Sequence, residues 1–105
     1  MITLNKVQED VLNDTKLDLS SKTPEQLRAI AYAGLAEEVG EVQGLRKRVL
    51  RNKPGDEKRC THEHFVEELG DVLWYLTMVC NLEHVDMEDM WQYCRNKLKE
   101  RYGHE

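Results

Sequence analysis

Apolar residues recur at helical spacing in separate segments of the chain. In the first segment Leu4, Val7 and Val11 lie three or four residues apart, which predicts a short helix. Residues 15–22 are polar and predict a loop. No segment shows the sustained alternation of apolar and polar residues that a half-buried strand requires. The pattern therefore predicts an all-α fold, most simply a four-helix bundle.

A second helix has a clear start. Thr23 can cap it, Pro24 suits the first helical position, and Gln26 stands where a capping box needs it. The helix is expected to run to about Leu50, and the Pro-Gly stretch within 52–60 predicts a turn.

Two further helices follow this turn. Thr61 can cap the third helix, which is expected to reach about Leu82, and Asp86 can cap the fourth. The apolar stripe of the fourth helix comprises Met87, Met90, Trp91, Cys94 and Leu98.

Composition narrows the class of protein. The chain has 105 residues, of which 40% are apolar and 33% charged, so residues 1–105 are expected to form one globular domain. Its longest nearly uninterrupted apolar run, 72–80, is far shorter than a membrane span, and residues 1–10 do not resemble a signal peptide. Three cysteines cannot all pair and are expected to be reduced thiols of a cytoplasmic protein. The net charge of −5 argues against general nucleic-acid binding.

The second helix carries an acidic residue where an apolar one is expected. Plotted at about 100° per residue, its apolar positions form one stripe. Glu38 falls in the middle of the stripe, Glu41 lies at its edge, and Glu37 lies further towards solvent. A buried unpaired charge is very costly, so Glu38 must be neutralised, paired or bound to a metal ion.

The third helix repeats this oddity. Between Val72 and Cys80 only Thr77 is clearly polar, so the helix is expected to be buried on nearly all sides. Glu68 and Asp71 are then expected to enter crowded, poorly hydrated surroundings. Each of the two helices offers an acidic pair at i and i+3, and residues at that spacing share a face. Mutual repulsion of the carboxylates predicts a hard divalent cation, for which Mg²⁺ is well suited.

Other metal sites fit less well. A di-iron bundle uses Glu-x-x-His, and no histidine of this chain has Glu three residues before it. Cys60, His62 and His64 straddle a loop and a helix start, which disfavours zinc.

A basic stretch is expected to be a solvated helix end, or to supply one or two cations to a phosphate ligand across a subunit boundary. It comprises Arg46, Lys47, Arg48, Arg51, Lys53, Lys58 and Arg59.

Taken together, these motifs resemble the MazG-like nucleotide pyrophosphohydrolases, which are all-α enzymes. The segments GLAEEVGEV (34–42) and EELGDVLWYL (67–76) are similar to the family's Glu-x-x-Glu and Glu-x-x-Asp motifs, and 26 residues (42–67) separate them. The segment KLKERY (97–102) resembles the family's closing motif. Cys94 is a departure, because many relatives have Asn there, so the base preference is left open.

The resemblance implies a specific activity. The family cleaves nucleoside triphosphates between the α and β phosphates, and a role in clearing the nucleotide pool follows. It implies that Mg²⁺, or Mn²⁺ as a substitute, is bound by Glu38, Glu41, Glu68 and Asp71. It also implies that Lys97 and Arg101 neutralise phosphate charge and that Tyr75 faces the nucleotide.

The general base and the functional class stay open at this point. Glu37 and Glu41 are the candidates for taking the proton of the attacking water. The alternatives to a triphosphate pyrophosphohydrolase are a non-catalytic helical interaction module and an enzyme similar to phosphoribosyl-ATP pyrophosphatase. The many-sided apolar third helix and the resemblance both predict a homodimer or homotetramer, with no nucleic-acid or membrane partner.

Overall fold

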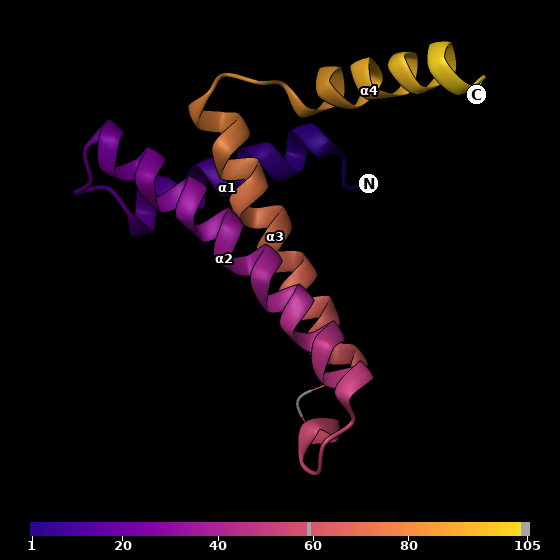
Figure 1. The fold of residues 1–105 in the computed structure, drawn as a ribbon. Coiled ribbons are helices and arrows are strands. Elements are labelled where there is room, and N and C mark those ends of the chain that lie inside the picture. The colour runs from indigo at the N-terminus through magenta and orange to yellow at the C-terminus, as the bar shows by residue number, and fades with distance from the viewer. Residues whose placement is uncertain (59, 104–105) are drawn as a thin grey trace.

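Four α helices make up most of the chain (Figure 1). The computed structural model describes residues 1–58 and 60–103. The helices are α1 (Leu4–Asp18), α2 (Pro24–Arg51), α3 (His62–Leu82) and α4 (Met87–Tyr102), and a 3-10 turn, η1 (Asp56–Lys58), lies between α2 and α3. No strand occurs in these described ranges, which confirms the all-α, four-helix prediction. None of the described helices has the length and apolar character needed to cross a membrane.

The predicted helix starts are confirmed by their hydrogen bonds. The backbone N–H of Gln26 donates to the Thr23 hydroxyl at 3.1 Å, and the Gln26 side chain accepts from the Thr23 N–H at 2.9 Å, which completes the capping box. Thr61 accepts from the N–H of His64, and Asp86 accepts from the N–H of Asp89. These are contacts between residues three apart, so local sequence suffices to fix them.

The expected loop at 15–22 begins too early, because α1 continues to Asp18. The Thr15 hydroxyl donates to the Val11 carbonyl at 2.7 Å, so this polar side chain satisfies its hydrogen bond on the helix itself. The Leu19 N–H then donates to the Thr15 carbonyl, and the Leu19 side chain packs against the core. Polar composition alone misplaced the end of this helix.

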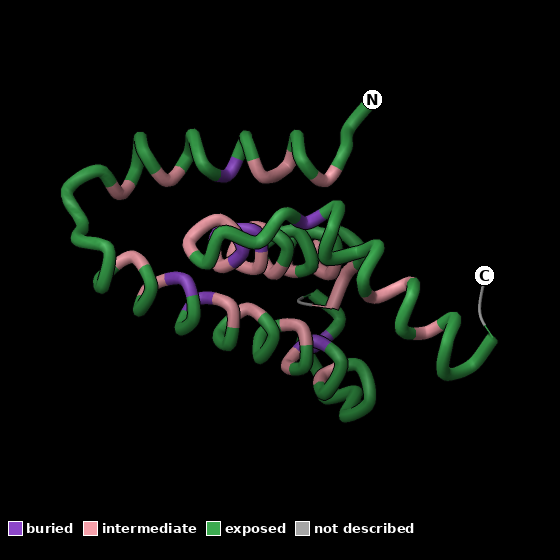
Figure 2. The backbone as a smooth tube through the Cα atoms, turned by 90° about the horizontal axis from the view of Figure 1, so that it is seen from above, coloured by how far each residue is buried: buried purple, intermediate pink, exposed green. Residues whose placement is uncertain are grey.

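Helices α2 and α3 lie side by side and antiparallel, and α1 crosses them at the end where α2 begins (Figure 1). The core lies where these three helices meet and contains Val11, Ala31 and Met78, all nearly inaccessible. Purple segments in Figure 2 are correspondingly few and lie where helices face one another. The opposite end of the α2–α3 hairpin therefore depends on other contacts.

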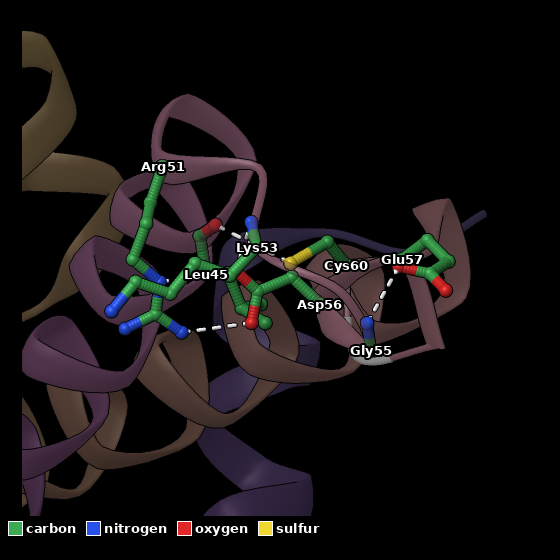
Figure 3. A network of polar contacts seen from close by, with 7 residues as sticks. All are labelled: Leu45, Arg51, Lys53, Gly55, Asp56, Glu57 and Cys60. Atoms are coloured by element: carbon green, nitrogen blue, oxygen red, sulfur yellow. Dashed lines mark hydrogen bonds and ion pairs between the residues drawn. The ribbon is translucent and has the colours of Figure 1, made fainter.

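A polar network closes that opposite end (Figure 3). The Arg51 guanidinium donates to both oxygens of Asp56, at 2.8 and 3.0 Å, and the Lys53 N–H donates to the same carboxylate at 3.0 Å. Asp56 is buried, and its paired Arg51 holds the pKa of that carboxyl below its ordinary value. The turn after α2 is therefore held by the hydrogen bonds of one carboxylate.

Helix α4 starts in contact with α1 and then runs away from the other helices (Figure 1). The Gln8 side chain holds this start: it donates to the Val85 carbonyl and accepts from the Met87 N–H, both at 2.8 Å. The radius of gyration of 16.6 Å exceeds the roughly 13 Å typical of a compact domain of this length.

The expectation that α3 is buried on nearly all sides is wrong for the single chain. Val66 and Leu69 are each 54% exposed and Leu73 is 40% exposed. The physical reason is that α1 and α2 cover only part of the circumference of α3, while α4 turns away.

Candidate active site

Three predicted carboxylates converge between α2 and α3. Glu38 comes from α2, and Glu68 and Asp71 come from α3. One carboxylate oxygen of each lies within 4.8 Å of the others. Glu38 and Glu68 are half-buried, whereas Asp71 is exposed, so the expectation of dry surroundings for Asp71 is wrong. Asp71 lies on the open side of the hairpin, where water and a ligand have access.

Burial, together with neighbouring negative charge, strongly perturbs Glu38. Burial raises the pKa of the Glu38 carboxyl to about 7, helped by its hydrogen bond to Glu68 and by the charges of Asp71, Glu68 and Glu37. Oxygen ligands at this spacing are what a hard divalent cation prefers, and such a cation would offset the repulsion. The donor set therefore fits Mg²⁺ or Mn²⁺.

A pocket of about 350 Å³ opens beside these carboxylates. Its lining among the described residues comprises Glu38, Asp71, Trp74 and Tyr75. Tyr75 lies one turn after Asp71, so the structure brings this predicted substrate-contacting residue to the carboxylates. A volume of this size is at the lower end of the range that small-molecule ligands occupy.

Gly34 makes room for Tyr75 in this wall. A Cβ atom at Gly34 would overlap the Tyr75 ring, so the ring lies directly against the backbone of α2. Gly34 is itself buried and stands one turn before Glu38. The close approach of ring and backbone thus sets both Tyr75 and Glu38 on the same side of the hairpin.

The other predicted residues of α2 lie at the margin. Glu37 and Glu41 are exposed, and neither belongs to the group of mutually close carboxylates found among the described residues. Glu37 still influences the site, because its charge contributes to the raised pKa of Glu38. The predicted roles of Glu41 as metal ligand and of both residues as general base stay predictions.

Lys97 and Arg101 lie elsewhere in the single chain. Both line a separate pocket of about 380 Å³ on α4, together with Tyr93, Asn96 and Glu100. Because α4 runs away from the α2–α3 hairpin, one chain does not bring these cations to the carboxylate pocket (Figure 1). Their phosphate-binding role also stays a prediction.

Trp74 and Asp14 are residues of the site that the sequence analysis did not assign. Trp74 lines the carboxylate pocket. Its indole N–H donates to the Asp14 carboxylate at 3.1 Å. Sequence reasoning missed Asp14; its helical spacing of three residues from Val11 is the one signal that could have placed it on the side of α1 nearest the core.

Two residues of the disfavoured zinc motif contact other groups. The Cys60 thiol lies 3.7 Å from the Leu45 carbonyl, and the His64 ring contacts the Thr61 hydroxyl, so these side chains have other partners. All three cysteines are free thiols, as expected. In the basic stretch Arg51 pairs with Asp56, which favours a structural role there, while Arg59 lies outside the described residues.

Comparison with known proteins decides the family. Residues 26–105 match the model of the MazG nucleotide pyrophosphohydrolase domain. The chain belongs to this family. The match to the MazG domain includes α3, α4 and nearly all of α2, but α1 precedes it.

A relative from a bacteriophage is similar over most of its length. This MazG-domain chain is 30% identical over 91 residues to the Gene 37 protein of Mycobacterium phage L5, which covers 85% of the chain and 80% of the relative. No solved structure matches the chain. Family membership confirms the resemblance drawn from the two acidic motifs and supports a nucleotide pyrophosphohydrolase activity.

Proposed function

We propose that this protein is a Mg²⁺-dependent hydrolase that splits nucleoside or deoxynucleoside triphosphates into a monophosphate and pyrophosphate. The observation that carries the proposal is the convergence of Glu38, Glu68 and Asp71 within 4.8 Å, beside a pocket lined by Tyr75. Membership of the MazG family supports the reaction type. Clearing unwanted nucleotides from the cellular pool is the role that this activity would serve.

The carboxylates act by holding the cation that the substrate needs. Glu38, Glu68 and Asp71 would bind Mg²⁺, with Glu41 completing the set by a change of rotamer from its exposed position. When bound, Mg²⁺ would offset the charge of the phosphate oxygens in the transition state. Tyr75 and Trp74 then border the space left for the nucleoside.

The reaction requires a water molecule and a proton acceptor. The water oxygen attacks the α-phosphorus in line, the bond to the bridging oxygen breaks, and pyrophosphate leaves. Glu37 and Glu41 stand on either side of Glu38 along α2 and are the proposed acceptors of the water's proton. No covalent enzyme intermediate is needed.

The active form is proposed to be a homo-oligomer, at least a dimer. The single chain exposes 7932 Å², against roughly 6,100 Å² for a compact monomer of its mass. Exposed apolar side chains on α3 and α4 supply a surface for a second copy. In such a dimer, Lys97 and Arg101 of one copy can meet the carboxylate pocket of the other, which a single chain does not achieve.

A panel of nucleotides tests the reaction. We expect pyrophosphate release from at least one nucleoside triphosphate with Mg²⁺ or Mn²⁺, loss of activity with chelator, and much slower turnover of the matching diphosphate. The triphosphate is preferred because the basic side chains of α4 and the metal ion stabilise a leaving pyrophosphate better than a leaving phosphate. Phosphoribosyl-ATP belongs in the panel, because its exclusive turnover would favour the related enzyme class.

Glu67→Gln is the matched control, since Glu67 is an exposed carboxylate beside Glu68 and outside the group of three. It should keep its activity, whereas Glu68→Gln should lose it. No pyrophosphate from any nucleotide, with folded protein and metal present, would indicate a non-catalytic interaction module.

A further inference from the structure

The aromatic wall of the carboxylate pocket is held from two directions. Tyr75 is fixed from α2, because its ring lies against Gly34. Trp74 is fixed from α1, because its indole N–H donates to the Asp14 carboxylate at 3.1 Å. The two rings meet edge to face, with centroids 5.1 Å apart and planes at 78°. A hydrogen bond at one end of this pair therefore constrains both rings.

The hydrogen bond comes from outside the family domain. Asp14 lies on α1, and the MazG domain match begins only at residue 26. Asp14 is exposed and Trp74 is half-buried, so this bond lies at the rim of the structure rather than in its core. An exposed bond of this kind contributes little to stability, and its clear effect is to choose one orientation of the indole.

We propose that Asp14 is a positioning residue that holds the indole of Trp74 as a stacking surface for the nucleobase. This inference rests on the proposed function, in which the metal ion at Glu38, Glu68 and Asp71 would hold the phosphates. The remaining lining of the same pocket is aromatic, and aromatic faces stack on bases of every kind. Helix α1 thus contributes to nucleotide affinity although it carries no residue of the acidic motifs.

Binding is measured directly through the fluorescence of Trp74. The chain has two tryptophans, so the background is Trp91→Phe, which removes the exposed indole on α4. The probes are ATP and CTP analogues with a methylene group between the α and β phosphorus atoms, and inorganic triphosphate as the ligand without a base. We expect the analogues with Mg²⁺ to change the Trp74 emission and inorganic triphosphate to leave it nearly unchanged.

Variants of Asp14 test the positioning role. Asp14→Ala should raise the Kd of the analogues and the KM of the substrate about tenfold, with kcat changed less than about twofold. Asp14→Asn keeps an acceptor oxygen and should restore binding close to that of the original protein. Asp10→Ala is the matched control on α1, since Asp10 lies one turn before Asp14 and pairs with Lys6, whereas Asp14 is the acceptor of the Trp74 indole N–H. It should leave Kd and emission unchanged.

Several results would overturn the inference. The inference is wrong if the Kd of the analogues is unchanged in Asp14→Ala, including the case in which kcat and the melting temperature fall. It is also wrong if Trp74 emission responds equally to the analogues and to inorganic triphosphate. Failure of the analogues to bind would also overturn it. Because binding is measured without turnover, Asp14-dependent binding in a protein that hydrolyses nothing would remove the proposed reaction alone. Hydrolysis that is indifferent to Asp14 would remove this inference alone.

Discussion

Glu38 is the residue on which the helical pattern, the carboxylate geometry and the family motif agree. Glu38→Gln keeps the side-chain volume and removes one negative charge from the group with Glu68 and Asp71. We expect the metal-free variant to melt at the same temperature or higher, because repulsion falls. We also expect turnover to drop at least about a hundredfold, roughly 2.7 kcal/mol in the barrier. Calorimetric melts and pyrophosphate assays, with and without Mg²⁺, measure both effects.

The metal response separates a ligand from a structural carboxylate. Mg²⁺ should raise the melting temperature of the original protein by mass action and raise that of Glu38→Gln much less. Glu67→Gln serves again as the control and should respond like the original protein. A Glu38→Gln protein that melts lower without metal yet keeps full activity is incompatible with a metal-binding Glu38.

At the scale of the elements, the α2–α3 hairpin depends on Asp56 at its distal turn (Figure 3). Asp56 accepts two hydrogen bonds from Arg51 and one from the Lys53 backbone, and the pKa of its carboxyl is lowered from 3.8, chiefly by Arg51. Asp56→Asn should lower the melting temperature by a few degrees at neutral pH. A carboxyl whose pKa is lower in the folded state than in the unfolded state stabilises the fold fully at a pH above its unfolded-state pKa. That stabilisation is lost as the pH falls through its folded-state pKa.

The pH dependence gives this prediction its sign. The difference in melting temperature between the two proteins should be largest at neutral pH and should shrink as the pH falls below 3.8. Glu57→Gln is the control, because Glu57 lies in the same turn and only accepts a bond from the exposed Gly55 N–H. An Asp56→Asn difference that stays constant over the whole acid range would show that the charge of Asp56 is not the cause.

At the scale of the whole molecule, the basic side chains of α4 are separated from the carboxylate pocket of their own chain. We therefore predict that each active site combines the carboxylates of one chain with the cations of another. Glu38→Gln and Arg101→Ala should each be nearly inactive alone. Mixed and allowed to exchange subunits, they should recover roughly a quarter of the original activity, because half of the dimers are mixed and each contains one intact site. Pyrophosphate release after mixing measures this recovery.

The control for subunit exchange is a mixture of two variants of the same set, Glu38→Gln with Glu68→Gln. All three carboxylates of a pocket come from the same chain. Every pocket of a mixed dimer therefore still lacks one carboxylate, and no activity should return. Light scattering of the original protein supplies the second measurement. An active monomer at micromolar concentration, or no recovery in the first mixture despite proven exchange, would contradict the shared site.

The sequence alone determined the features that depend on neighbouring residues. The caps at Thr23, Thr61 and Asp86 were predictable because a cap and its backbone partner stand three residues apart. Helical periodicity also placed Glu38 on the inward stripe of α2, and the spacing of the acidic motifs indicated the family. A polar stretch was a weaker guide, since Thr15 bonds its own helix and α1 continues through it.

Only the tertiary structure decided which distant residues share the pocket. The convergence of Glu38 with Glu68 and Asp71, and the exclusion of Glu41 from that group, depend on how α2 and α3 rotate about their axes. The contact between Asp14 and Trp74 joins residues 60 positions apart. The direction of α4 depends on the connection before it, which Gln8 holds by two hydrogen bonds and which no helical periodicity encodes. Periodicity fixes the face of each helix, whereas packing between helices fixes which faces meet, and that requires the whole chain at once.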